Sequence, residues 1–318
     1  MPDLIQELAT EVSDGHVIAF LGAGSALACE SGQGGGATGQ DLARDIIKHL
    51  GEDPANFSGS LMEVSEFLEA ASPQHRRALD DFVYRRLKDL RPTVGHLLLP
   101  LFPWRALITT NYNQVIERGF AVASQHGITT KICRVIRADS ELTTGHSPSE
   151  VPLYKPHGCL GLLYDHNAPL VLTARDYYNS TTKRKRIYDE VRELAGNFST
   201  LFIGYSLVDY NFNNIYYELG EKLRDYLSRS YSVGPVAPHK KHYLEQVFQR
   251  RDIKLIDDKF DSFVIRLADK VGVLAAPEVF EVVIAELSRP EVLNRLGSQY
   301  INELPSAVRN ELVARGRL

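Results

Sequence analysis

The sequence predicts an α/β fold: a doubly wound, Rossmann-like, mostly parallel sheet with a smaller helical insertion and a helical C-terminal tail. Two observations carry this prediction. Short apolar runs, of the length of buried parallel strands, alternate with amphipathic helical patterns through the middle of the chain. Several of these runs end in glycine or in polar residues, as strands do before a turn. Strands that alternate with helices imply parallel pairing and right-handed crossovers.

The composition restricts the class of protein. The 318 residues are 44% hydrophobic and 24% charged, which is typical of a globular protein. The formal charge of −4 leaves no basic excess, so nucleic acid is not a favoured partner of the surface as a whole. No window approaches the roughly 18 apolar residues that span a bilayer, and the acidic, amphipathic N-terminus is not that of a signal peptide. We therefore expect a cytoplasmic protein without membrane contact.

The three cysteines are Cys29, Cys133 and Cys159. None forms a C-x-x-C pair, and no histidine lies at ligand spacing from two of them, so the sequence predicts no metal site. Scattered thiols also fit a reducing compartment and no disulfide framework.

The N-terminal third predicts one strand and several helices. A helix with Leu4, Leu8 and Val12 on one face precedes the apolar run HVIAFL, which begins at His16 and is typical of a buried strand. The glycine-rich segment 30–40 cannot pack a core, so we expect a mobile loop or a loop shaped around a ligand. Helical patterns follow at residues 39–50, 61–71, 74–90 and 93–104, the last broken by Pro100 and Pro103.

The alternation then becomes regular. Strands are predicted at residues 106–109, 131–136, 151–155, 170–173, 200–204 and 253–256. Helices are predicted after several of them, notably at residues 188–195, 213–227 and 243–250. Segment 229–241 is rich in proline and glycine and is interpreted as a loop. From Phe260 the pattern is helical, with Pro277 and Pro290 as breaks.

Two units are expected from this pattern. Residues 1–275 form one domain, with the helical insertion at about residues 39–103. Residues 276–318 form the helical tail, which we expect to contact another copy or a partner.

The first candidate binding motif is Gly22-Ala23-Gly24-Ser25, directly after the first predicted strand. Small residues let a backbone approach a phosphate, and free amides at a following helix N-terminus favour its negative charge. The full dinucleotide-binding fingerprint needs a third glycine where Leu27 stands. An ordinary turn explains this motif equally well.

The second motif, Thr109-Thr110-Asn111-Tyr112-Asn113, ends an apolar strand in polar residues. Threonine and asparagine are good helix caps, which is the simpler interpretation. The carboxyl ends of parallel strands are also where open α/β sheets place their ligands.

The third and fourth motifs follow two later strands. His157 stands between Pro156 and Gly158, and its ordinary pKa of about 6.5 suits proton transfer near neutrality. A lone histidine is more often an ordinary surface or core residue. In the fourth motif, Gly204 and Ser206 offer an amide and a hydroxyl to a ribose or phosphate. The alternative is a glycine turn followed by a helix that Asp209 caps.

Taken together, GAG, TTNYN, KPHG and GYSLVD, in this order and at these separations, resemble the sirtuin family in its prokaryotic, zinc-free branch. The resemblance covers about residues 17–271. It implies that Gly22, Ala23, Gly24 and Ser25 cradle the NAD⁺ pyrophosphate and that Asn111 lies beside the nicotinamide ribose. It further implies that His157 is the catalytic base and that Gly204 and Ser206 bind the adenosine side. The other residues expected to contact NAD⁺ are Thr110, Asn113 and Asp209.

Two departures from the family qualify the activity that the resemblance implies. Deacylating sirtuins carry a four-cysteine zinc module, which helps form the acyl-lysine cleft, and this chain has no such module. Hydrolysis of NAD⁺ itself is therefore favoured over deacylation. Asn113 stands where the family usually has an aspartate, which lowers the negative charge near the nicotinamide.

The resemblance thus implies an NAD⁺ hydrolase that acts in bacterial antiphage defence by abortive infection. It is expected to form a homo-oligomer and to be activated by a HerA-like ATPase, a short Argonaute or a C-terminal region outside this sequence. Two alternatives remain open: a module that senses NAD⁺ or ADP-ribose without turnover, and an NAD-dependent protein deacylase or ADP-ribosyltransferase. The basic run KRKR at residues 183–186 is interpreted as the solvated start of a helix, with contact to an acidic partner or nucleic acid as the alternative.

Overall fold

The computed structural model describes residues 3–32, 34–71, 73–143, 145, 147–165, 167–205, 229–250 and 252–318. The strands are β1 Val17–Leu21, β2 Glu30–Ser31, β3 Gly34–Gly35, β4 Ala106–Thr109, β5 Ile132–Ile136, β6 Glu150–Tyr154, β7 Ser199–Ile203, β8 Ser230–Val233 and β9 Ile253–Ile256. The first helices are α1 Leu4–Ser13, α2 Gly39–Leu50, α3 Leu61–Ala71, α4 Pro73–Leu87, α5 Val94–Leu98, α6 Val115–Gln125, α7 Ala174–Lys183 and α8 Lys185–Asn197. The later helices are α10 Pro238–Arg250, α11 Phe260–Val271, α12 Pro277–Leu287, α13 Pro290–Leu296, α14 Ser298–Glu303 and α15 Ser306–Ala314.

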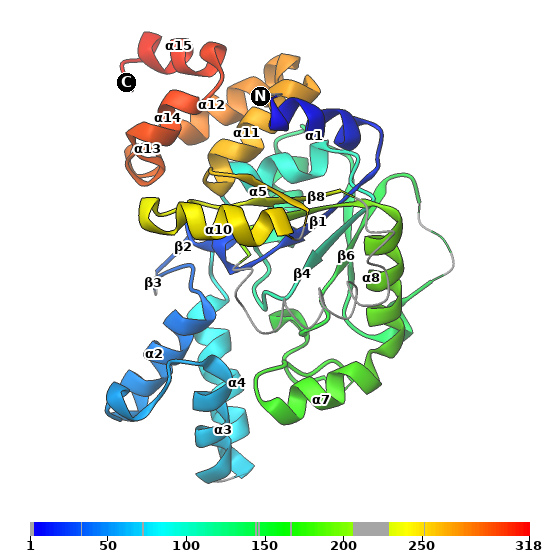
Figure 1. Ribbon diagram of the computed structural model, residues 1–318, viewed down its shortest axis with the longest axis vertical. Coiled ribbons are helices and arrows are strands. Elements are labelled where there is room, and N and C mark those ends of the chain that lie inside the picture. Colours follow the sequence, from blue (N-terminus) through cyan, green and yellow to red (C-terminus); the bar gives the residue numbers. More distant parts are fainter. Residues whose placement is uncertain are drawn as a thin grey trace.

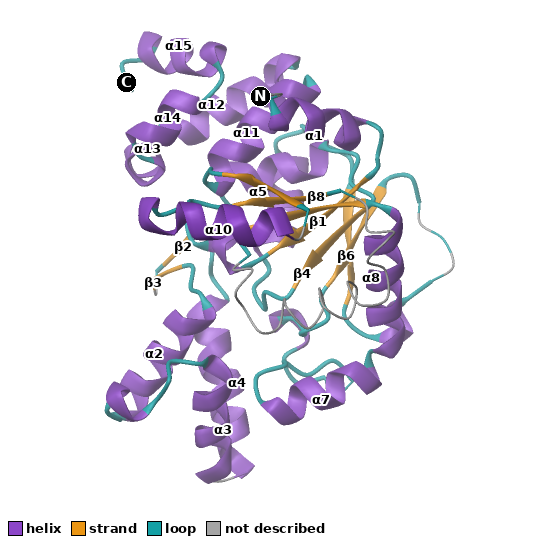
Figure 2. Cartoon of the chain, viewed as in Figure 1, coloured by secondary structure: helices purple, strands orange, loops and turns teal. Residues whose placement is uncertain are grey.

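Seven strands form one parallel sheet in the order β5-β6-β4-β1-β7-β8-β9, with helices on both faces (Figure 1, Figure 2). From the central strand β1 the chain builds β4, β5 and β6 on one side and β7, β8 and β9 on the other. This order confirms the predicted doubly wound α/β fold.

Strand β1 shows how the two faces are filled. Val17, Ala19 and Leu21 enter the larger core with residues of α1, α5, α6 and α11. Ile18 and Phe20 enter the second core with residues of α8 and α10. Successive strand residues point to opposite faces, so a continuous apolar run is buried on both sides.

The predicted helix 39–50 is confirmed as α2, and its ends follow from local chemistry. Thr38 caps the first turn and forms a capping box with Asp41. Gly51 ends the helix in the left-handed conformation, at φ 73°. Helices α2, α3 and α4 form a bundle that extends away from the sheet, near α7 (Figure 1).

Two predictions about strands are wrong. Residues 170–173 are buried but form no strand, because Thr173 caps α7 and the carbonyl and amide of Val171 bond to loop residues instead. Residues 230–233, interpreted as part of a loop, form β8 between β7 and β9. The alternation of serine with apolar residues in β8 gave too weak a signal against the surrounding proline and glycine. The predicted helix 213–227 lies outside the described residues.

The glycine-rich segment contains the β2–β3 hairpin, which neighbouring helices hold in place. Arg86 of α4 donates to the Gly35 carbonyl at 2.6 Å. Arg295 of α13 donates to the Ala28 carbonyl at 2.6 Å and lies 2.8 Å from a Glu30 carboxylate oxygen. The C-terminal helices therefore contact the segment that follows β1.

The C-terminal helices share the larger core of the sheet. Val283, Leu287, Val308 and Leu312 are fully buried in it. The predicted boundary between residues 1–275 and a separate tail stays a prediction, as does the contact role of that tail. In the described part of the chain, no helix has both the length and the apolar character needed to cross a membrane.

Candidate active site

The four motifs follow four neighbouring strands. In the sheet, β6, β4, β1 and β7 are consecutive and parallel, so the segments after them emerge at the same edge. His157 follows β6, Asn111 follows β4, Gly22 follows β1 and Gly204 follows β7. This edge includes the point where the winding of the sheet reverses, which is where doubly wound sheets bind ligands.

The polar residues after β4 connect this strand to β1. The side-chain amide of Asn111 donates to the Gly22 carbonyl at 2.9 Å, and its backbone amide donates to Thr109 Oγ1 at 3.1 Å. The Thr109 hydroxyl in turn donates to the Leu21 carbonyl at 2.6 Å. Asn111 is half-buried, and no described residue donates to its Oδ1. An acceptor is therefore available at the strand edge.

The next polar residues have different roles. The Thr110 hydroxyl lies 2.6 Å from the Tyr205 hydroxyl, which links the ends of β4 and β7. Asn113 is buried, and its Oδ1 accepts a hydrogen bond of 3.4 Å from the Val115 amide at the start of α6. Asn113 thus bonds locally at the start of α6, whereas Thr109, Thr110 and Asn111 hold the strand ends together. The expected contact of Asn113 with NAD⁺ stays a prediction.

The glycines after β1 allow the turn after β7 to approach closely. The Gly24 amide donates to the Gly204 carbonyl at 2.9 Å. A Cβ added at Gly24 would lie 2.6 Å from the Gly204 Cα, and one added at Gly22 would lie 2.6 Å from the Gly204 carbonyl oxygen. Gly204 itself has φ 63°, a left-handed conformation that favours glycine. The close contact between the two turns explains why Gly22, Gly24 and Gly204 are glycines.

The rest of the first motif forms a short 3₁₀ helix, Ala23–Ala26. Ser25 is buried, its hydroxyl donates to the Gly22 carbonyl at 2.7 Å, and its amide donates to the same carbonyl at 3.1 Å. These groups stabilise the turn. The expectation that Gly22, Ala23, Gly24 and Ser25 hold a pyrophosphate stays a prediction.

His157 lies in a tightly held loop after β6. Its carbonyl accepts a hydrogen bond of 3.0 Å from the Val171 amide. The Val171 carbonyl accepts one of 2.7 Å from the hydroxyl of Tyr112, so the histidine loop is joined to the motif after β4. The imidazole packs edge-on against the Tyr177 ring, with 5.2 Å between ring centroids. No described residue forms a hydrogen bond with its ring nitrogens.

The imidazole of His157 is neutral near physiological pH. It is 4% exposed, and burial together with the nearby Arg184 guanidinium lowers its pKa to about 3. A neutral imidazole has an unprotonated nitrogen that can accept a proton.

Lys155 is a site residue that the sequence reasoning missed. It ends the apolar run two residues before His157 and is fully buried. Its ammonium group donates to the Asn113 carbonyl and lies 2.9 Å from a Glu117 carboxylate oxygen. Burial by itself lowers the pKa of Lys155, but Glu117 outweighs this effect and the pKa is raised. The only signal was a charged residue directly after four apolar positions.

Arg184 is the second missed residue. Lys183, Lys185 and Arg186 are exposed, as the interpretation of KRKR as a solvated helix start requires. Arg184 is buried at the junction of α7 and α8, so that interpretation is wrong at this one position. Nothing in the basic run itself distinguishes Arg184 from its neighbours.

Ser206 and Asp209 lie outside the described residues. The other predicted site residues belong to segments at the common edge of the sheet: Gly22, Ala23, Gly24, Ser25, Thr110, Asn111, Asn113, His157 and Gly204. Among the described residues, no group of three or more histidine, cysteine or acidic side chains is arranged to hold a metal ion.

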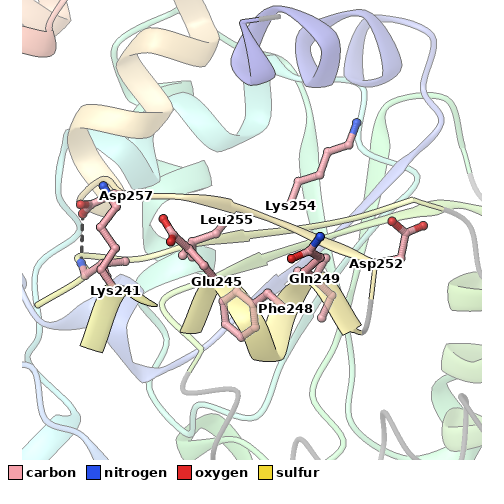
Figure 3. A pocket seen from close by; sticks show the side chains of 10 residues that line it. Lys241, Glu245, Phe248, Gln249, Asp252, Lys254, Leu255 and Asp257 are labelled. Atoms are coloured by element: carbon pink, nitrogen blue, oxygen red, sulfur yellow. Dashed lines mark hydrogen bonds between the residues drawn. The ribbon is translucent and has the colours of Figure 1, made fainter. Parts of the chain in front are cut away.

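A surface groove of about 410 Å³ lies elsewhere, between α10 and β9 (Figure 3). Its lining includes Lys241, Glu245, Phe248 and Lys254, and Asp257 accepts a hydrogen bond of 3.0 Å from the Val236 amide beside it. The groove contains none of the predicted site residues, so it does not mark the candidate active site.

Comparison with known proteins finds a family match for the central part of the chain. The family model described as a SIR2-like domain matches residues 105–256, just under half of the chain. No curated protein matches it. SIR2-like domains bind NAD, which supports an NAD-related function. The match includes the Asn111, His157 and Gly204 segments, whereas Gly22 lies before it and is hydrogen-bonded to Asn111 and to Ile203 within it.

Proposed function

Because residues 105–256 are a SIR2-like domain, we propose that the chain is an NAD⁺ hydrolase that cleaves the bond between nicotinamide and ribose to give nicotinamide and ADP-ribose. The observation that carries this proposal is that the segments of Asn111 and His157 follow the neighbouring parallel strands β4 and β6 and so emerge at one sheet edge. Their segments are linked by Tyr112 and Val171. NAD⁺ is the substrate, and no step of the proposed reaction requires a metal.

The chemistry needs a rigid, water-poor site. Loss of neutral nicotinamide leaves an oxocarbenium-like cation on the ribose, and a single water must then attack it. Asn111 is fixed through Gly22, so its Oδ1 is held ready to accept a hydrogen bond from a ribose hydroxyl or from that water. Pre-oriented groups of this kind stabilise a transition state without reorganising during the reaction.

His157 accepts the proton in this scheme. With a pKa of about 3 in the free protein it is a weak base. A water that bonds to a cationic carbon becomes strongly acidic, so a weak but unprotonated base suffices. The buried Lys155–Glu117 pair stabilises the backbone of both motifs and does not enter the reaction itself.

The test is nicotinamide release from NAD⁺ by the purified chain and by Asn111→Ala and His157→Ala. Each substitution is expected to lower the rate by about two to three orders of magnitude. The matched controls are Asn197→Ala and His126→Ala, two exposed positions on other elements, which should retain wild-type rates. NAD⁺ binding without release by the wild type, both alone and with a candidate activator, would contradict hydrolysis and favour a sensor. Release that requires an acyl-lysine peptide would favour a deacylase.

We also propose that the biological role is depletion of NAD⁺ in bacterial antiphage defence, by abortive infection. Such an enzyme must be inactive until triggered, so we expect a homo-oligomer or an activating protein, a HerA-like ATPase or a short Argonaute. The contact of Arg295 with Ala28 and Glu30 supports a route by which the C-terminal helices influence the segment after β1.

This regulatory proposal has its own test. Arg295→Gln removes the contact and leaves the buried apolar residues of the C-terminal helices in place. Light scattering and nicotinamide release, each with and without a candidate activator, are then compared with the wild type. Identical assembly and activation in the variant would overturn the route through Arg295.

A further inference from the structure

Arg184 is a large, fully buried cation close to His157. It is 1% exposed, and no described carboxylate forms an ion pair with it. The carboxylates whose charge acts on the Arg184 guanidinium are those of Asp176, Asp139 and Asp165. Asp176 instead pairs with Arg76 at 2.6 Å, and Asp139 accepts hydrogen bonds from backbone amides at the start of α8. A buried charge without a close counter-ion is costly, so its retention calls for a functional reason.

The guanidinium group bridges two backbone carbonyls. Its Nη1 donates to the Pro156 carbonyl and its Nη2 to the Pro169 carbonyl, both at 2.5 Å. The first belongs to the residue before His157. The second faces Gly158, where an added Cβ would lie 2.7 Å from the Pro169 carbonyl oxygen. Arg184 thus joins the residue before His157 to the Pro169 carbonyl, which packs against Gly158, through one planar group.

The charge of Arg184 also acts on the imidazole. Of the residues that the structure describes, Arg184 and Tyr177 are the charged and titratable groups that act on or contact His157, and Tyr177 contacts the ring edge-on. Around Arg184 itself, Tyr188 joins the three aspartates as a titratable neighbour. A protonated His157 would stand beside an uncompensated cation, which disfavours protonation of the free enzyme.

We propose that Arg184 is a positioning residue for the reaction: it ties the carbonyl before His157 to the carbonyl that packs against Gly158, and it places a positive charge beside the imidazole. This inference rests on the proposed hydrolase function. Two features of arginine are needed together, its rigid fork of donors and its permanent charge. Lysine supplies the charge without the fork, and glutamine supplies a shorter donor without the charge.

The test compares Arg184→Lys and Arg184→Gln with the wild type, with Arg186→Gln as the exposed control from the same basic run. Nicotinamide release should fall at least tenfold in kcat in both variants, with KM for NAD⁺ changed less than threefold. In Arg184→Gln alone, the acid limb of the kcat profile should move to higher pH, by about one unit. Loss in KM alone, or loss in kcat without this difference between the variants, would overturn the proposal.

A second readout does not depend on turnover. The ¹⁵N signals of the His157 imidazole report its protonation directly, and in Arg184→Gln they should move toward the protonated form at higher pH than in the wild type. If the wild type releases no nicotinamide even with a candidate activator and this shift is present, the hydrolase proposal fails and the electrostatic role of Arg184 stands. An unchanged imidazole titration overturns the role of Arg184 whatever the activity. If Arg184→Lys or Arg184→Gln folds poorly, Arg184→Ala is measured with and without added guanidinium ion. The added ion should raise the kcat of Arg184→Ala, and an unchanged kcat counts against the proposal.

Discussion

The side-chain amide of Asn111 donates a hydrogen bond of 2.9 Å to the carbonyl oxygen of Gly22. This bond joins a residue of the matched SIR2-like region to the glycine motif that precedes it in sequence. It also fixes which end of the Asn111 amide faces Gly22, because only the nitrogen can donate. The oxygen is then left for a ligand.

The orientation of Asn111 can be tested with Asn111→Asp. Aspartate has the same shape but no donor, so its carboxylate is repelled by the Gly22 carbonyl and leaves this position. We expect nicotinamide release to fall by about two to three orders of magnitude, measured as kcat at saturating NAD⁺. Asn197→Asp on the exposed face of α8 is the control. Near wild-type kcat in Asn111→Asp would show that the bond to Gly22 is not what orients this residue.

Contact between the turns after β1 and β7 makes Gly24 sensitive to substitution. In Gly24→Ala the new Cβ meets the Gly204 Cα at 2.6 Å, and the Gly204 atoms around it are all backbone atoms, which cannot rotate away. We expect a loss of about 2 kcal/mol or more in the free energy of unfolding, measured by chemical denaturation. In Gly39→Ala the new Cβ has only ordinary van der Waals contact, with Leu61 Cβ at 3.8 Å, so the free energy of unfolding should change by less than about 0.5 kcal/mol. Equal stabilities for the two variants would contradict the role assigned to this contact.

Stability should fall on mild acidification because of His96. This residue is fully buried, accepts a hydrogen bond of 3.2 Å from the Thr93 amide at Nδ1, and has its pKa lowered by burial from 6.5 to about 3. The unfolded chain takes up the proton below pH 6.5 and the folded chain does not until about pH 3. This contribution is therefore fully present above pH 6.5 and is lost as the pH falls toward 3, by about 2 kcal/mol at pH 5.

Comparison of the wild type with His96→Asn isolates this effect. Asparagine keeps an acceptor for Thr93 but does not titrate, so its unfolding free energy should change less between pH 7 and pH 5. In both proteins His157, whose pKa burial also lowers to about 3, acts with the same sign, and Asp261, whose pKa burial raises, acts with the opposite sign. An equal change in unfolding free energy between pH 7 and pH 5 in the wild type and in His96→Asn would rule out His96 as the source of the acid sensitivity.

Arg76 connects the helical bundle to the loop that contacts His157. It donates to Asp176 at 2.6 Å and to the Leu170 carbonyl at 2.8 Å, and it also pairs with Asp80 on its own helix. Arg76→Gln leaves two half-buried carboxylates without their cation, and we expect a loss of about 2–3 kcal/mol. Hydrogen exchange should then speed up in α4 and α7 before other helices. Exposed Arg77→Gln is the control, and unchanged protection of α7 in Arg76→Gln would argue against this connection.

The sequence by itself determined the alternation of strands and helices and the residues at the strand ends. Local patterns were enough, because a buried parallel strand needs an apolar run and the helix after it needs a cap and an apolar face. Most strands and the helix 39–50 follow from such signals. The four motifs also follow from local signals, since each is a short run of residues beside a strand whose own residues predict it.

Only the tertiary structure decided which buried run is a strand and which is not. Residues 170–173 have the stronger local signal for a strand, yet 230–233 finds two parallel partners, whereas Val171 bonds to His157 and Tyr112. Tertiary structure also decided that, in the run KRKR, Arg184 turns inward to the Pro156 and Pro169 carbonyls while its neighbours stay in solvent. The physical reason is the same in each case. A hydrogen-bond partner distant in sequence chooses between states that local propensity leaves nearly equal, and no local pattern contains that partner.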